Sequence, residues 1–316
     1  VTEGQMFYRT DTGDLKVTVT DYGTATWASG GSLNTGRGRP GSSSANNNSA
    51  LFFGGAVPPT SYKDETENYN GTSWTEVNEL NTGRTGSVGI GHSAEAAFCI
   101  SGYTGSNVDN VESFNGTSWT ETTEINTGRT WGVGGAGTTT SGIIFGGYTT
   151  TNVNSVESWD GSAWTETTEI NTARTGVGSA GASNTDALIF AGDVHPTSPR
   201  NSNTVEKWDG SSWTEVSEVN TARLDLGGAG ATSTDAMAFG GASTPNSEDE
   251  TETWNGSSWT EVSELATASR YMGIQSNGTT SSAICAGGSS SGPSQNEATT
   301  QEWSTPSSLT SLTITD

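Results

Sequence analysis

The chain has 316 residues, of which only 30% are hydrophobic, and 35 acidic against 12 basic residues give it a formal net charge of −23. An acidic surface of this kind repels nucleic-acid backbones and anionic lipid headgroups, so nucleic-acid binding and membrane binding are not expected. No run of about 18 apolar residues is present, and no membrane insertion is therefore expected.

An arginine recurs six times along the chain, each time eighteen residues before the second residue of a Gly-Gly-like pair. The spacings run from Arg37 to Gly55, Arg84 to Gly102, Arg129 to Gly147, Arg174 to Gly192, Arg223 to Gly241 and Arg270 to Gly288. Self-similarity at a fixed period is the signature of a repeat architecture. We expect one supersecondary unit copied around most of the chain.

Each unit is predicted to form four short strands, called a to d. In the unit that begins at Arg84, clusters of Gly, Asn and Ser separate stretches of β-branched and small residues. This pattern is typical of strands rather than helices. An Asn-Gly or Asp-Gly pair supplies a tight turn between strands c and d at residues 70–71, 115–116, 160–161, 209–210 and 255–256.

Two aromatic residues, five positions apart, flank each of these turns. The pairs are Tyr69 and Trp74, Phe114 and Trp119, Trp159 and Trp164, Trp208 and Trp213, and Trp254 and Trp259. Tyr22 and Trp27 form a sixth pair before the first arginine, whereas Trp303 is a lone strand c aromatic near the end. The two chain ends are therefore expected to complete one blade together, which removes open sheet edges. Whether its third strand comes from the Tyr22 or the Trp303 segment stays open.

A Gly-Gly at the end of strand b, followed by an aromatic residue and a Trp across the c–d hairpin, resembles the kelch repeat. The resemblance covers about residues 15–303 and implies an all-β fold, a six-bladed kelch-like β-propeller with four antiparallel strands per blade. Residues 1–14 then form an N-terminal connector, and residues 304–316 a C-terminal tail or extra strand. Cys99 and Cys285 lie in non-adjacent units and are expected to be buried free thiols.

The connection between strands b and c differs in length from unit to unit, whereas the other connections are nearly constant. Unequal loops on one face of a rigid scaffold are a common way to build a binding surface. The candidate ligand-binding residues on this face are Tyr103, Tyr148, Asp193, His195, Arg200 and Asn201. The tyrosines offer flat faces for a sugar ring or an aromatic side chain. Alternatively, these residues serve only to form the turns of the loops and to pack against their neighbours.

The repeated arginines are expected to circle the mouth of the central channel on the same face. They are Arg37, Arg84, Arg129, Arg174, Arg223 and Arg270. One role for them is a clamp for an anion. The other is structural, in pairs with Glu67, Glu112, Glu157, Glu206, Glu252 and Glu302. Their presence in every unit favours a structural arginine ring.

No catalytic constellation is visible in the sequence. The two histidines, His92 and His195, lie two units apart, with no zinc-ligand spacing and no Ser-His-Asp or Cys-His set. We therefore expect a protein that is not an enzyme and that uses no cofactor and no metal ion. A glycosidase with a carboxylate pair stays open, because 35 acidic residues offer many pairs.

Residues 3–17 are similar to segments of bacteriophage tail-fibre and other virion proteins, and the Asn-Gly-Thr-Ser-Trp-Thr-Glu repeats are similar to propellers of marine phages. The resemblance implies a recognition domain on a virion surface, hence extracellular, that binds a host surface glycan or protein through the b–c loops. Its N-terminal segment would contact other virion proteins. The alternatives are a structural decoration or adaptor protein of the virion and a bacterial extracellular adhesion module.

Overall fold

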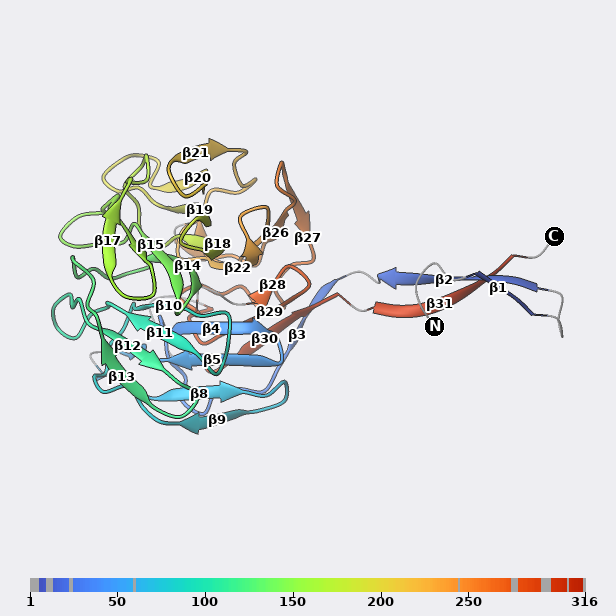
Figure 1. Ribbon diagram of the computed structural model, residues 1–316, viewed down its shortest axis with the longest axis horizontal. Coiled ribbons are helices and arrows are strands. Elements are labelled where there is room, and N and C mark those ends of the chain that lie inside the picture. The colour runs from blue at the N-terminus through green and yellow to red at the C-terminus, as the bar shows by residue number, and fades with distance from the viewer. Residues whose placement is uncertain are drawn as a thin grey trace.

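The computed structural model describes residues 6–9, 14–22, 25–58, 61–243, 245–273, 278–290, 297–305 and 307–314, and these residues form strands and no helix. Six four-stranded antiparallel sheets are arranged radially as the blades of a β-propeller (Figure 1). The predicted all-β, six-bladed architecture is therefore confirmed. Within the described residues, nothing resembles an apolar helix of membrane-spanning length.

Blades one to three follow one another along the chain, each with strands a to d in order from the axis outward. Blade one consists of β4 (Gly41–Asn46), β5 (Ser49–Phe53), β8 (Thr66–Tyr69) and β9 (Trp74–Val77). Blade two consists of β10 (Val88–Ile90), β11 (Ala97–Ile100), β12 (Val111–Phe114) and β13 (Trp119–Thr122). Blade three consists of β14 (Gly134–Thr138), β15 (Ser141–Phe145), β16 (Val156–Trp159) and β17 (Trp164–Thr167).

Blades four and five repeat this plan. Blade four consists of β18 (Gly178–Ser183), β19 (Asp186–Asp193), β20 (Asn201–Trp208) and β21 (Trp213–Val216). Blade five consists of β22 (Gly227–Thr232), β23 (Asp235–Phe239), β26 (Thr251–Trp254) and β27 (Trp259–Val262). Two small ribbons lie in b–c loops: β6 (Ala56–Val57) with β7 (Ser61–Tyr62), and β24 (Ala242–Ser243) with β25 (Asn246–Ser247).

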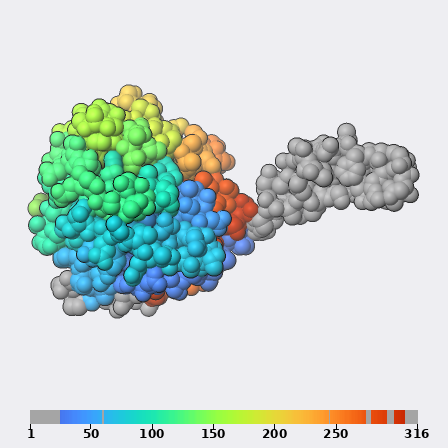
Figure 2. Space-filling view, turned by 60° about the horizontal axis from the view of Figure 1, so that its bottom comes forward, coloured from blue at the N-terminus to red at the C-terminus, as the bar shows by residue number. Residues whose placement is uncertain are grey.

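Blade six closes the ring with strands from both ends of the chain. It consists of β28 (Gly278–Thr279), β29 (Ser282–Ala286), β30 (Thr300–Ser304) and, from the N-terminal region, β3 (Thr26–Ser29). Trp27 on β3 lies opposite Trp303 on β30, so Trp303 supplies strand c and Trp27 strand d. The blue and red ends of the coloured body accordingly lie next to each other (Figure 2).

The remaining terminal strands form a separate sheet. β2 (Asp14–Tyr22) pairs with β1 (Met6–Arg9) on one side and with β31 (Ser307–Ile314) on the other (Figure 1). Tyr22 is paired with Ser307, so the third strand of blade six comes from the Trp303 segment and not from the Tyr22 segment. The physical reason is that Trp303 already fills the strand c place opposite Trp27. Residues 15–22, which the sequence assigned to the propeller, belong to this sheet instead.

Aromatic contacts join blades two to six each to the blade before it. The Trp119 ring on β13 lies 4.9 Å from the Phe53 ring on β5, at an interplanar angle of 66°. The equivalent pairs are Trp213 with Phe145 at 5.2 Å, Trp259 with Phe190 at 5.2 Å and Trp27 with Phe239 at 5.0 Å. Such pairs add roughly 0.5–1.5 kcal/mol each beyond the burial of their area. The core is therefore distributed between the blades.

Strands a pack closely around the axis, and this requires glycine at the points of contact. A Cβ at Gly89 would lie 1.9 Å from the Ser42 carbonyl oxygen, and one at Gly228 would lie 2.4 Å from the Ser179 carbonyl oxygen. Both distances are shorter than any real contact, so a side chain would push the inner strands apart. The small residues that the sequence places in strand a are thus explained by crowding.

The two cysteines are buried and unpaired, as expected. Cys99 lies on β11 and Cys285 on β29, which belong to non-adjacent blades. Burial raises the pKa of the Cys99 thiol to about 11 and raises the pKa of Cys285 as well. Both side chains therefore act as small apolar groups in the core.

Candidate functional site

Five of the six repeated arginines are buried and paired with glutamates on strand c. The pairs are Arg37 with Glu67, Arg84 with Glu112, Arg129 with Glu157, Arg174 with Glu206 and Arg223 with Glu252, and no side chain among them is more than 1% exposed. Strand c is the third strand from the axis. The expectation that these arginines circle the channel mouth is therefore wrong, because their partners hold them inside the blades.

Each of these glutamates is further satisfied by an asparagine from the connection between strands d and a. Asn126 illustrates the arrangement: its backbone N–H and its Nδ2 donate to Glu157 Oε2 at 2.7 and 2.9 Å. The same two bonds recur in the other four pairs. A buried ion pair is tolerated when hydrogen bonds satisfy its remaining polar atoms, and here they satisfy the carboxylates. Among the described residues, the Nε groups of Arg37, Arg129, Arg174 and Arg223 have no hydrogen-bond partner.

The sixth unit departs from the pattern. The Gly241 N–H donates to the Ser269 carbonyl at 2.8 Å, as the Gly192 N–H donates to the Arg223 carbonyl at 2.9 Å, so Ser269 holds the arginine place. Gln301 holds the glutamate place and accepts a hydrogen bond from the Thr267 N–H at 3.0 Å. Arg270 is displaced by one residue, and Glu302 instead accepts a hydrogen bond from the Tyr69 hydroxyl. The expected pairing of Arg270 with Glu302 is wrong, because one extra residue follows Trp259.

A ring of backbone hydrogen bonds surrounds the axis on the face of the b–c loops. It is formed by the residue two positions after each arginine place, and we call these six residues the collar: Arg39, Gly86, Trp131, Gly176, Asp225 and Tyr271. At five of the six steps around the axis, the N–H of one collar residue donates to the carbonyl of the collar residue one blade earlier, for example from Asp225 to Gly176 at 2.8 Å and from Arg39 to Tyr271 at 2.6 Å. At the remaining step, the Thr130 hydroxyl donates to the Gly86 carbonyl at 3.4 Å. Every collar residue has a φ between 54° and 64°.

Four collar positions carry large side chains in a conformation that favours glycine. The left-handed region is strained for residues with a Cβ, by about 1 kcal/mol or more. Gly86 and Gly176 show that glycine fits the collar, whereas Arg39, Trp131, Asp225 and Tyr271 occupy the other places. The collar therefore gathers four side chains on a strained backbone at one point of the surface.

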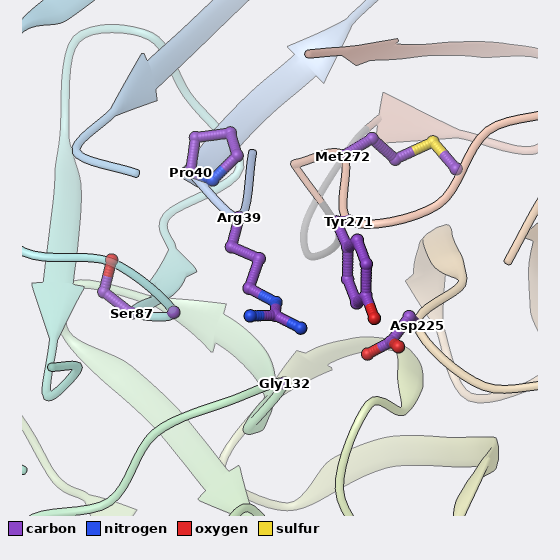
Figure 3. A pocket seen from close by; sticks show the side chains of 8 residues that line it. Arg39, Pro40, Ser87, Gly132, Asp225, Tyr271 and Met272 are labelled. Carbon is purple, nitrogen blue, oxygen red and sulfur yellow. The ribbon is translucent and has the colours of Figure 1, made fainter. Parts of the chain in front are cut away.

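The collar side chains contact one another over the axis. The Arg39 guanidinium carbon lies 4.0 Å from the centroid of the Tyr271 ring and 5.4 Å from that of Trp131. Figure 3 shows the Arg39 and Tyr271 side chains next to each other, with their ends near the Asp225 carboxylate. Burial raises the pKa of Asp225, while Arg39 and Arg270 act in the opposite direction. The space beneath these side chains is only about 10 Å³, so the side chains form the floor of the site.

A cavity of about 410 Å³ opens above this floor, and we call it the axial cavity. Its lining residues are Arg39, Trp131, Tyr148, Asn152, Thr175, Asp193, His195, Arg200, Asp225 and Tyr271. Trp131 is 42% exposed and is the one large hydrophobic side chain exposed among the described residues. Its ring stacks on Tyr148 with a centroid distance of 5.4 Å and an angle of 13°. The wall therefore presents a supported, flat aromatic face.

Four of the six candidate residues from the sequence line this cavity. Tyr148 supports Trp131, and the buried Asp193 carboxylate accepts hydrogen bonds from Arg200 Nε at 2.7 Å and from the His195 N–H at 2.9 Å. Tyr103 packs edge-on against Tyr62 at 5.7 Å instead. Asn201 donates to the Ala242 carbonyl at 3.3 Å.

The collar residues were missed by the sequence reasoning, which looked for variation only in the b–c loops. They lie in the connection between strands d and a. Its length is nearly constant from unit to unit, so the differences in its residues are easily overlooked. The sequence contains a signal for them: two residues after the arginine place, the units carry four different residue types, in Arg39, Gly86, Trp131, Gly176 and Asp225. Tyr271 was further concealed by the extra residue before it.

The b–c loops around the cavity are tied to the next blade. Asn107 Nδ2 donates to the Tyr148 carbonyl at 3.2 Å, and Asn152 Nδ2 donates to the Asp193 carbonyl at 2.7 Å. Each loop thus holds the first residue of its neighbour's loop. A site built this way is largely formed before any ligand arrives, which reduces the entropy lost on binding.

No protein-family model matches the sequence, and no curated protein shows significant similarity to it. Across the described residues, no three His, Cys, Asp or Glu side chains gather closely enough to hold a metal ion. The side chains that line the axial cavity offer aromatic faces, hydrogen-bonding groups and charged groups.

Proposed function

We propose that this propeller is a non-enzymatic recognition domain that binds a saccharide of a host surface in the axial cavity. The observation that carries the proposal is Trp131: an indole with 42% exposure, stacked on Tyr148, on a backbone with a φ of 59°. A flat, rigid aromatic face that borders a cavity suits stacking against the apolar face of a sugar ring. The volume of about 410 Å³ falls within the roughly 300–1,000 Å³ of small-ligand sites.

The biological setting of this proposal comes from sequence resemblance. We propose that the repeats are kelch-like, that the domain lies on the surface of a phage-like virion, and that its N-terminal segment attaches it to other virion proteins. The arrangement of β1, β2 and β31 supports the last point, since both chain ends share one sheet that is separate from the blades. A single attachment of this kind leaves the opposite parts of the ring accessible to a host surface.

The test compares two aromatic residues on the same face. Wild type, Trp131→Ala and Tyr103→Ala are applied to a glycan array and to host cells, and affinities for the hits are measured by calorimetry. Trp131→Ala is expected to weaken binding at least tenfold, because the stacking face is lost. Tyr103→Ala is the matched control and should bind like wild type, because Tyr103 packs against Tyr62 outside the cavity. Equal binding by wild type and Trp131→Ala would contradict the proposal.

Imaging of labelled particles tests the setting separately. A recognition domain is expected in few copies at fibre tips. Many copies along a tube or shell would favour a structural decoration protein instead.

A further inference from the structure

We propose that the saccharide bound in the axial cavity carries a carboxylate, and that Arg39 is the residue that binds it. This inference rests on the proposed function and names its ligand class. Three sets of observations carry it: where the arginines lie, what Arg39 contacts, and what surrounds it.

The arginines divide into two groups. Of those with described side chains, five form the buried pairs with glutamate, and the other three are Arg39, Arg200 and Arg270. Arg39 and Arg200 line the axial cavity, and the Arg270 guanidinium lies 5.2 Å from the ring of Tyr271, which lines it too. In a chain with a net charge of −23, these arginines gather at one point. Such a local reversal of charge attracts an anion.

Within this group Arg39 is the one available to a ligand carboxylate. Arg200 is already engaged, since its Nη2 lies 2.5 Å from Asp193 Oδ2. Arg39 forms no ion pair with any carboxylate among the described residues, and its guanidinium lies over the face of Tyr271 at 4.0 Å. Stacking of this kind holds the plane of a guanidinium, and the N–H groups lie in that plane, at its edge rather than under the ring. A planar fork of N–H donors matches the two oxygens of a carboxylate.

The acidic groups of the cavity do not cancel this attraction. Asp193 is neutralised by its ion pair with Arg200. Asp225 is partly buried in the cavity floor, near the Arg39 guanidinium, and has both Arg39 and Arg270 as nearby cations. Each aspartate of the cavity lining thus already has an arginine close to it. Burial additionally favours the neutral form of Asp225, as its raised pKa indicates.

The surroundings of Arg39 favour an acidic sugar over an acidic peptide. The Trp131 ring lies next to the guanidinium, at 5.4 Å, so one ligand ring could stack on the indole while its carboxylate reaches Arg39. Tyr148, His195 and Tyr271 line the same cavity and carry polar groups for sugar hydroxyls. A peptide that binds as a strand needs an unpaired sheet edge. In the blades the free edge is strand d, on the outside of the ring.

The experiment uses a matched pair of ligands, an oligosaccharide that contains uronic acid and the same oligosaccharide after reduction of its carboxyl groups to alcohols. Dissociation constants for both are measured by calorimetry with the full chain. Wild type is expected to prefer the acidic form by roughly tenfold to hundredfold, the range of a charge-assisted, bidentate contact. Arg39→Gln should bind both forms equally, at the affinity of wild type for the reduced form. Arg39→Lys should fall between, because it keeps the charge and loses the fork.

The outcomes separate this inference from the proposed function. If wild type binds the acidic and the reduced oligosaccharide equally, and Trp131→Ala binds neither, the saccharide site stands and the role of Arg39 is overturned. If wild type binds no saccharide of either form, the proposed function itself fails. A peptide rich in Glu and Asp is tested in parallel, and tight binding of that peptide without binding of the uronic acid would overturn the inference in favour of a protein ligand. Thermal unfolding of each variant confirms that it is folded.

Discussion

Arg129 Nη2 donates a hydrogen bond of 2.7 Å to Glu157 Oε1, and the two side chains are only 0% and 1% exposed. The same pair occurs in five units, and in the sixth both charges are replaced together, by Ser269 and Gln301. A buried charge without its partner is strongly unfavourable, whereas a neutral pair is tolerated. The joint replacement indicates that the arginine and the glutamate act as one structural unit.

Replacing Arg129 alone should therefore be more harmful than replacing the pair. Arg129→Ser leaves Glu157 buried and unpaired, and we expect a loss of about 3–5 kcal/mol in the free energy of unfolding. The double variant Arg129→Ser with Glu157→Gln copies the sixth unit and should recover part of that loss. Urea denaturation followed by circular dichroism measures both. Strict additivity of the two single substitutions would contradict a coupled pair.

The buried thiols should make stability decrease at alkaline pH. The pKa of Cys99 is raised from 9.0 to about 11 in the folded state, so between these values the unfolded chain ionises and the folded chain does not. The free energy of unfolding is therefore unaffected by this thiol below about pH 9 and decreases progressively as the pH rises toward 11. Unfolding free energies at pH 8, 9 and 10 measure the slope. Cys99→Ala is the control and should show a shallower decrease.

The collar predicts an unusual order of stability for two substitutions of Trp131. Both Trp131→Gly and Trp131→Ala remove the ring, but only alanine keeps a Cβ at a φ of 59°. We expect the glycine variant to be more stable by about 1 kcal/mol, the reverse of the usual order. Thermal unfolding of the two variants measures the difference directly. An alanine variant as stable as the glycine variant would show that the collar is not strained at this position.

Closure of the ring by β3 predicts a sharp limit to truncation from the N-terminus. A fragment of residues 25–305 keeps β3 and all six blades, and it should unfold cooperatively near the temperature of the full chain. A fragment of residues 31–305 loses the contacts of Trp27 with Phe239 and Trp303 and its 3.0 Å hydrogen bond to Thr251. We expect it to aggregate or to unfold at a much lower temperature, as size-exclusion chromatography and calorimetry will reveal. Equal stability of the two fragments would argue against closure by β3.

The sequence by itself determined the architecture, because that architecture depends on local and repeated chemistry. Asn-Gly turns set the c–d hairpins, Gly-Gly pairs end strand b, and paired aromatic residues join neighbouring sheets, so six copies of one unit predicted six blades. It also pointed to the loop residues Tyr148, Asp193, His195 and Arg200, which line the axial cavity, because variable loop length is visible in one dimension.

Only the tertiary structure decided how the units meet. Contacts between distant segments decide which residue pairs with Trp27 and which residue takes the sixth arginine place. They also bring together the side chains over the axis, those of Arg39, Trp131, Asp225 and Tyr271. The physical reason is that ring closure brings the equivalent residue of every unit to one point. There each side chain acquires neighbours that its own unit does not contain.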